Sequence, residues 1–337
     1  MEPVTNTLAA IALGRAGLNK VTRAATPMLV VSGVIADVDW VTRLGGARPF
    51  LLGHHTVTHS LPGTVVLVAA VAAGFWLAGR KYPKLAVNIP QAILLCTVGA
   101  GMHLLLDMLN SDGIKLLWPF SPRWYGWDLA NSVDAWIIFF LLCGLLTPEL
   151  FRLILEEIGS KPKKRGRQRG AIVGLILVAL FIAGRAFAHE RALALLDSRE
   201  YRRQVPLEVA AFPHPSNPLI WSGVAETDNA LITVEVPLGP LAVFDPDLGE
   251  VYFKPEPSIT LTNAMHSPTA MEFLSFARFP LAHVEPQGRG YEVRLRDMRF
   301  GFKDPGERGI IAVINLNAES LVVGERLEFD RSPDIAR

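Results

Sequence analysis

Six apolar segments separated by short polar stretches occupy the chain up to residue 188. They are Val4–Leu18, Ala24–Ala36, Leu61–Ala78, Ile89–Leu109, Val133–Thr147 and Ala171–Ala188. A helix needs about 20 apolar residues to cross a bilayer. The fourth segment reaches that length, the third and sixth approach it, and the fifth reaches it if Asp128–Ser132 lies at the interface. We expect the first two, which are shorter, to be tilted half-spans or re-entrant pieces covered by protein.

The hydrophobic pattern changes after His189. The stretch Ala188–Arg203 carries charges along its length and predicts a helix or stalk that leaves the membrane. From Val205 onward, short runs of alternating polarity lie between clusters of Pro, Gly, Asn and Asp, as is typical of strands and turns. The predicted strands include Leu231–Val236, Val251–Phe253, Tyr291–Leu295, Ile310–Ile314 and Leu321–Phe329.

The predicted fold class is therefore an α-helical integral membrane domain followed by a mostly-β extracytoplasmic domain. The multi-helix membrane domain covers residues 1–188, a stalk covers 189–204, and the soluble β domain covers 205–337. Within the β domain, Gly288-Arg289-Gly290 predicts a hairpin turn, and Ser267-Pro268 predicts the capped start of a short helix.

Composition agrees with a membrane protein. Half of the residues are hydrophobic, only 19% are charged, and the mean hydropathy is +0.30. A net charge of +1, without a basic stripe that contains aromatic residues, argues against a nucleic-acid partner. Cys96 and Cys143 lie in apolar runs and provide neither a disulfide framework nor a cysteine metal site. Because the N-terminal residues lack a basic n-region and a cleavage site, we expect no removable signal peptide.

Basic residues gather in alternate loops. These loops contain Arg15, Lys20 and Arg23, then Arg80, Lys81 and Lys84, then Lys161, Lys163, Lys164, Arg165, Arg167 and Arg169. The positive-inside rule places all three in the cytoplasm, although the last run by itself would also fit a basic patch for acidic lipid or nucleic acid. The β domain and the titratable ends of the other loops then lie on the outer side. These outer residues are Asp37, Asp39, His54, His55, His59, His103, Asp107, Asp112, Asp128 and Asp134.

Three of the eight histidines fall within the stretch His54–Ser60. If this stretch is helical, His55 and His59 share a face, whereas His54 and His59 pair only if a turn intervenes. Packing histidines seldom occur this close together, so we predict that at least two of the three bind a metal.

Two further pairs have spacings that suit a metal site. His103 and Asp107 share one face of a helix, where both can ligate, or the carboxylate can hold the second nitrogen of the imidazole. A hydrogen bond that locks two helices is the alternative. Asp37 and Asp39 point the same way in extended backbone but not in a helix, and they would also suit a solvated helix terminus. Imidazoles mixed with carboxylates favour Zn, Mn or Fe(II) over Ca or Mg.

These stretches resemble the YdjM-like family of inner-membrane metal-dependent hydrolases. The family's Pro-Asp-x-Asp turn is matched by Ala36–Asp39, its His-Arg-x-x-Thr-His-Ser by His54–Ser60, and its later His-x-x-x-Asp by His103–Asp107. Its N-terminal Asp-x-x-Thr-His-x-Leu is matched with two changes, Glu2 for Asp and Asn6 for His.

The resemblance implies a bacterial cytoplasmic (inner) membrane location and adds to the ligand assignment. It makes His54 the ligand, where helical spacing alone favours His55, which stands in place of the family's Arg. The predicted ligands of a divalent metal ion, zinc before Mn or Fe, are Asp37, Asp39, His54, His59, His103 and Asp107.

The predicted activity is metal-assisted hydrolysis at the outer face of the membrane. Asp39 or Asp128 would take a proton as general base. The partners would be membrane lipids and an amphiphilic or lipid-linked ester or phosphoester. The β domain would cover the site through Pro213–Trp221, with the indole at a ligand or membrane edge. A metal- or proton-coupled transporter that uses the same His/Asp cluster is the alternative.

Overall fold

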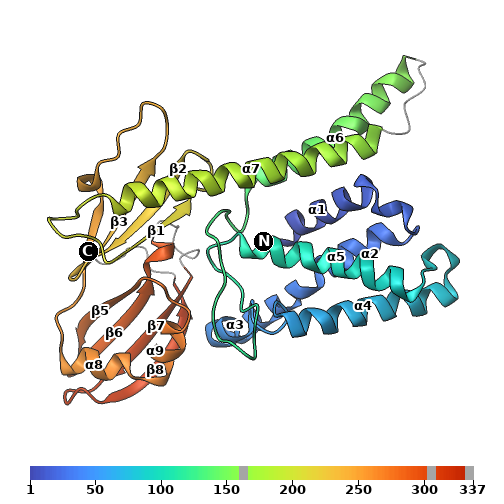
Figure 1. Cartoon of the computed structure of the whole chain (residues 1–337). Helices are drawn as coiled ribbons and strands as arrows, with labels where there is room; N and C mark the ends of the chain where they lie inside the picture. The colour runs from blue at the N-terminus through green and yellow to red at the C-terminus, as the bar shows by residue number, and fades with distance from the viewer. Residues whose placement is uncertain (159–165, 302–308, 331–337) are drawn as a thin grey trace. The chain divides into compact units, whose positions relative to one another are not determined.

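The fold consists of two packing units, drawn together in Figure 1. The computed structural model describes residues 1–158, 166–301 and 309–330. The first unit contains Met1–Asp39 and His55–Phe187, and the second contains Trp40–His54 and the chain from Ala188 onward. The second unit therefore includes a short segment from within the predicted membrane domain.

Helices make up the regular structure of the first unit's described residues. Its helices are α1 (Pro3–Ala16), α2 (Ala25–Ser32), the 3-10 helix η2 (Ile35–Gly45), α4 (Leu61–Lys81), α5 (Ile89–Met108), α6 (Ala135–Glu157) and α7 (Gly166–Asp197), with 3-10 turns at Leu18–Lys20 and Pro83–Leu85. Two of these helices, η2 and α7, continue into the second unit. Among the described residues, five helical stretches are long and apolar enough to cross a membrane: Ala25–Gly45, Leu61–Lys81, Ile89–Met108, Ala135–Glu157 and Gly166–Asp197. The first predicted segment forms α1, which is too short to be one of the five.

Small residues allow the helices of this unit to approach closely. A methyl group on Gly99 of α5 would overlap the Ser32 hydroxyl oxygen and lie 2.7 Å from the Leu29 carbonyl oxygen of α2. In the same way, a methyl group on Gly144 of α6 would lie 2.7 Å from the Cα of Gly174 in α7. Such backbone contacts are typical of helices that pack in an apolar environment. The close approach of α2 and α5 later sets the position of a site histidine.

The basic loops lie together at one end of this unit. Lys20 donates to Gln168 at 3.0 Å, Gln168 donates to the Ala16 carbonyl oxygen at 2.8 Å, and Thr22 donates to the Ala86 carbonyl oxygen at 3.0 Å. These contacts join the loop after α1, the loop before α5 and the start of α7. Lys161, Lys163, Lys164 and Arg165 of the predicted basic run lie outside the described residues.

The second unit contains two antiparallel four-stranded sheets, in the orders β1-β2-β3-β4 and β5-β6-β7-β8. The strands are β1 (Glu208–Pro213), β2 (Ile220–Glu226), β3 (Ala230–Pro237), β4 (Glu250–Phe253), β5 (Pro280–Gln287), β6 (Gly290–Asp297), β7 (Ile310–Leu316) and β8 (Val322–Phe329). All five predicted strands are confirmed, as is the hairpin turn, where Gly288 has a φ of +62°. The helices α8 (Ile259–Met265) and α9 (Pro268–Leu274) lie on the second sheet, and Ser267 caps α9 as predicted.

Two expectations concern the start of this unit. The stretch Ala188–Arg203 was predicted to form a helix or stalk, and α7 continues through it to Asp197, with buried Ala192 and Leu196 packed against the first sheet. The expectation for Trp221 is wrong, because the indole is 0% exposed and packs 5.2 Å from the His189 ring, between centroids. Alternation along β2 turns Trp221 inward, toward the end of α7.

Candidate metal centre

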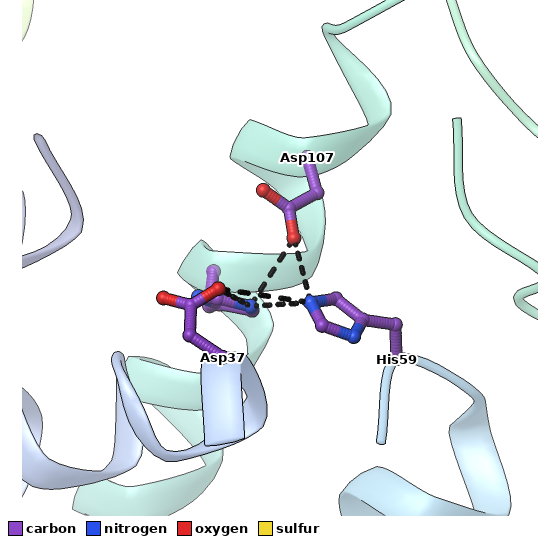
Figure 2. A group of neighbouring side chains, drawn as sticks. Asp37, His59 and Asp107 are labelled. Carbon is purple, nitrogen blue, oxygen red and sulfur yellow. Dashed lines mark hydrogen bonds and ion pairs between the residues drawn. The ribbon is translucent and has the colours of Figure 1, made fainter. Parts of the chain in front are cut away.

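Four buried side chains of the first unit meet at one point: Asp37, His59, His103 and Asp107. Each offers one ligand atom, and these atoms all lie within 4.8 Å of one another. Figure 2 shows Asp37, His59 and Asp107 pointing toward one another from separate elements. Asp37 lies in η2, His59 just before α4, and Asp107 in the last turn of α5. The group therefore lies at the end of α5 opposite to the basic loops.

The local sequence around His59 fixes its position. Ser60 caps α4, because its hydroxyl oxygen accepts from the Gly63 amide at 3.1 Å and donates to the Val57 carbonyl oxygen at 2.8 Å. A methyl group on Gly63 would overlap that carbonyl oxygen. Glycine therefore allows the turn that carries His59 to lie against the first turn of α4.

The distances between the ligand atoms suit a small cation. The Nε2 atoms of His59 and His103 lie 3.0 Å apart, and they lie 3.0 and 3.1 Å from Oδ2 of Asp107. Oδ1 of Asp37 lies 4.0 and 3.8 Å from the same two nitrogens. Tetrahedral ligands about 2.0–2.2 Å from a zinc ion are separated by roughly 3.3–3.6 Å. The residues present therefore fit a metal of this size.

Hydrogen bonds on the far side of each ring orient both imidazoles. His103 Nδ1 lies 2.9 Å from the Gly33 carbonyl oxygen, which can only accept, so this nitrogen carries the hydrogen. The close packing of α2 and α5 at Gly99 brings that carbonyl within reach. His59 Nδ1 lies 3.0 Å from Oδ2 of Asp39. Both Nε2 atoms consequently face the centre, as metal-ligating histidines do.

Asp39 lies behind His59 and is not one of the four grouped side chains. Its Oδ2 accepts from the His55 amide at 2.9 Å and from the Thr58 hydroxyl at 2.8 Å. A 3-10 helix has three residues per turn, so Asp37 and Asp39 point in different directions from η2. One carboxylate reaches the Nε2 side of His59 and the other reaches its Nδ1 side.

The other predicted residues also lie outside the group of four. His54 stacks on Phe50 with ring centroids 4.5 Å apart, within the second unit. His55 has a φ of +57°, and its Nδ1 lies 2.9 Å from the Gly113 carbonyl oxygen. Since the backbone there is left-handed, the helical spacing that favoured His55 does not apply.

Asp128 is buried and has a φ of +56°. Its neighbours attach this loop to the end of α5, because the Trp127 amide donates to the Met108 carbonyl oxygen and the Leu129 amide to the Leu109 carbonyl oxygen, both at 2.8 Å. Hydrogen bonds therefore hold the backbone on both sides of Asp128 against the end of α5, the helix that carries Asp107.

Two N-terminal groups at this end of the unit were not among the predicted site residues. The Met1 amino group contacts Oδ1 of Asp107, and burial lowers the pKa of this amino group to about 6. Asn6 is fully buried, and its Nδ2 donates to the Met1 carbonyl oxygen at 3.3 Å. The match of the first helix to the family pattern was the signal that could have placed Asn6 here.

Comparison with known proteins agrees with the membrane character of the first unit. The family described as YdjM inner membrane protein matches residues 1–192. YfhP of Bacillus subtilis (strain 168), described as an uncharacterized protein, is 26% identical over 101 residues, which are 30% of this chain and 29% of YfhP. The chain thus spans less than a third of the length of this relative. No solved structure matches the chain.

Proposed function

Because the chain belongs to the YdjM inner membrane protein family, we propose that it is a membrane-bound metal-dependent hydrolase. Its centre would hold one divalent cation, zinc before Mn or Fe(II), on Asp37, His59, His103 and Asp107. The observation that carries this proposal is the 3.0 Å separation of the two histidine Nε2 atoms. Two N–H groups cannot point at each other at that distance, so at least one lone pair faces the other ring.

The surroundings strengthen the case for a cation. Both histidines and both aspartates of the group are buried, so water does not offset the charge of the carboxylates. Burying carboxylates is unfavourable unless nearby positive charge offsets them. The Met1 amino group contacts one oxygen of Asp107, and a divalent cation would add positive charge and accept the lone pairs of the rings.

A bound cation of this type acts as a Lewis acid, which polarises a carbonyl or phosphoryl oxygen and activates water for attack. Asp39 would orient His59 through Nδ1 and keep its ligand nitrogen facing the centre. Because Oδ2 of Asp39 already accepts from an amide and a hydroxyl, we assign the general base to Asp128. Asp128 would then accept the proton of the attacking water.

The loop after α5 favours an amphiphilic substrate. Trp118, Phe120 and Trp127 on this loop are 36, 86 and 44% exposed. Aromatic rings of this kind concentrate at membrane–water interfaces. A lipid-linked ester or phosphoester would therefore have its head group near the level of the site. By the positive-inside rule the basic end is cytoplasmic, so the site and the β domain would be extracytoplasmic.

Metal analysis of the purified full-length protein tests the proposal. We expect about one equivalent of a divalent metal in the wild type, with loss of that metal and of ester or phosphoester hydrolysis in His59→Ala plus His103→Ala. The matched control is His266→Ala plus His283→Ala, which removes two histidines of the second unit. If the purified wild-type protein contains no divalent metal, the proposal is wrong. Metal or proton flux in proteoliposomes that depends on His103, without hydrolysis, would favour the transporter.

A further inference from the structure

The segment Trp40–His54 lies in the sequence between Asp37 and Asp39 on one side and His59 on the other, and it folds with the second unit. Its helix α3 (Ala47–Gly53) packs on β8. Ala47 and Leu51 are about 5% and 6% exposed and share a buried cluster with Ile310 of β7. The segment is therefore anchored to the second sheet by apolar contacts.

Polar and aromatic contacts add to this anchor. Arg48 donates to both carboxylate oxygens of Glu272 in α9, at 2.9 and 2.6 Å. The Arg43 guanidinium carbon lies 4.4 Å from the ring centre of Phe329 in β8 and 5.4 Å from that of Phe50. Fork-like Arg–carboxylate pairs and cations over aromatic faces both fix orientation as well as distance.

A hydrogen bond closes the segment at its base. The His55 amide, just after the segment, donates to Oδ2 of Asp39, just before it, at 2.9 Å. The same oxygen lies 3.0 Å from Nδ1 of His59. One carboxylate oxygen thus joins the two ends of the segment and the ring whose other nitrogen faces the centre.

We propose that the second sheet is a positioning element of the metal centre. By holding Trp40–His54 in one conformation, it sets the distance between Asp39 and His55 and thereby the orientation of His59. An unanchored segment of this length samples many end-to-end distances, and ordering it would oppose each binding event. Arg48, Arg43 and Phe329 are then positioning residues that touch neither the metal nor the substrate. The proposal rests on the metal centre proposed above.

The test uses Glu272→Gln, which removes the charge opposite Arg48 and keeps the volume. Glu226→Gln is the matched control, because Glu226 pairs with Lys254 at 2.6 Å and is 26% exposed, while Glu272 pairs with Arg48 at 2.6 Å and is 24% exposed. The readouts on the full-length protein are Co²⁺ affinity by chelator competition and, without metal, hydrogen exchange of the amides of residues 55–60. Thermal unfolding is recorded alongside.

Ion pairs exposed to solvent are weak, so Glu272→Gln should weaken Co²⁺ binding only about twofold to fivefold. Adding Phe329→Leu should bring the loss to about tenfold, since the cation–π contact has a similar strength. The exchange of residues 55–60 should speed up in parallel. The charge swap Arg48→Glu with Glu272→Arg should return both measures to within about twofold of wild type.

Two results would overturn the inference: a doubly substituted protein that matches the Glu226→Gln control on both measures, or a charge swap that restores neither. If the wild type binds no Co²⁺, the proposed function fails, and the exchange measurement alone decides. In that case unchanged protection of residues 55–60 in the double variant overturns the positioning role, and lost protection supports it.

Discussion

Asp39→Asn tests whether a carboxylate outside the group of four controls the centre. Oδ2 of Asp39 lies 3.0 Å from His59 Nδ1 and accepts from the His55 amide at 2.9 Å and the Thr58 hydroxyl at 2.8 Å. The substitution keeps the shape of the side chain and removes its charge. The ligand atoms themselves remain.

The expected size of the effect follows from those contacts. A hydrogen bond to a charged group contributes about 1.5–3 kcal/mol and one between neutral groups about 0.5–1.5 kcal/mol. Neutralising Asp39 should therefore weaken the interaction between residue 39 and Nδ1 of His59 by about 1–1.5 kcal/mol, or roughly tenfold. Partners that orient metal ligands typically account for about 10–100-fold in metal affinity. We expect a loss within that range, smaller than that of His103→Ala.

The assay is Zn²⁺ or Co²⁺ affinity of purified protein in detergent or nanodiscs, by chelator competition. Asp134→Asn is the matched control, because Asp134 is a buried carboxylate that pairs with Arg185 at 3.6 Å and is not one of the grouped residues. Asparagine also caps helices, so α6 should keep its start. If the affinity of Asp39→Asn stays within about threefold of wild type, which is less than the loss expected for a residue that orients a metal ligand, the orienting role is refuted. A loss as large as that of His103→Ala would make Asp39 a ligand.

Three further substitutions test the local geometry and the chemistry. Gly63→Ala should lower the free energy of unfolding by about 1–3 kcal/mol, because the added methyl group overlaps the Val57 carbonyl oxygen. Gly74→Ala in the same helix is the control: its methyl group has nothing within 4 Å, so thermal unfolding should show a neutral or stabilising effect. Gly99→Ala should push α2 away from α5, move the Gly33 carbonyl away from His103 and so weaken metal binding. Gly101→Ala is the control, because its methyl group would meet open space; equal metal affinity in the two variants would contradict the prediction. Asp128→Asn should lower kcat about 100-fold or more while leaving metal affinity unchanged, and an unaltered kcat would remove it as the base.

Regular periodicity allowed much of the fold to be predicted. The apolar lengths gave the long helices, alternation gave the strands of the second unit, and helical spacing put His103 and Asp107 on one face of α5. These patterns depend on backbone geometry that repeats from residue to residue, so neighbours in sequence are sufficient to read them. The cluster of three histidines and the pair of nearby aspartates indicated His59, Asp37 and Asp39 as candidates, and the resemblance to the family favoured the same residues.

Only the tertiary structure determined the directions of the site side chains that lie in irregular backbone. The left-handed φ of His55 and the 3-10 turn through Asp37 and Asp39 determine where each side chain points, and neither has a repeating signal. His54 stacks on Phe50, in a segment that packs on a sheet more than two hundred residues downstream. Contacts between distant segments form only when the whole chain packs. Their free energy comes from burying apolar surface against residues far away in the sequence, and the local sequence does not indicate which residues these are.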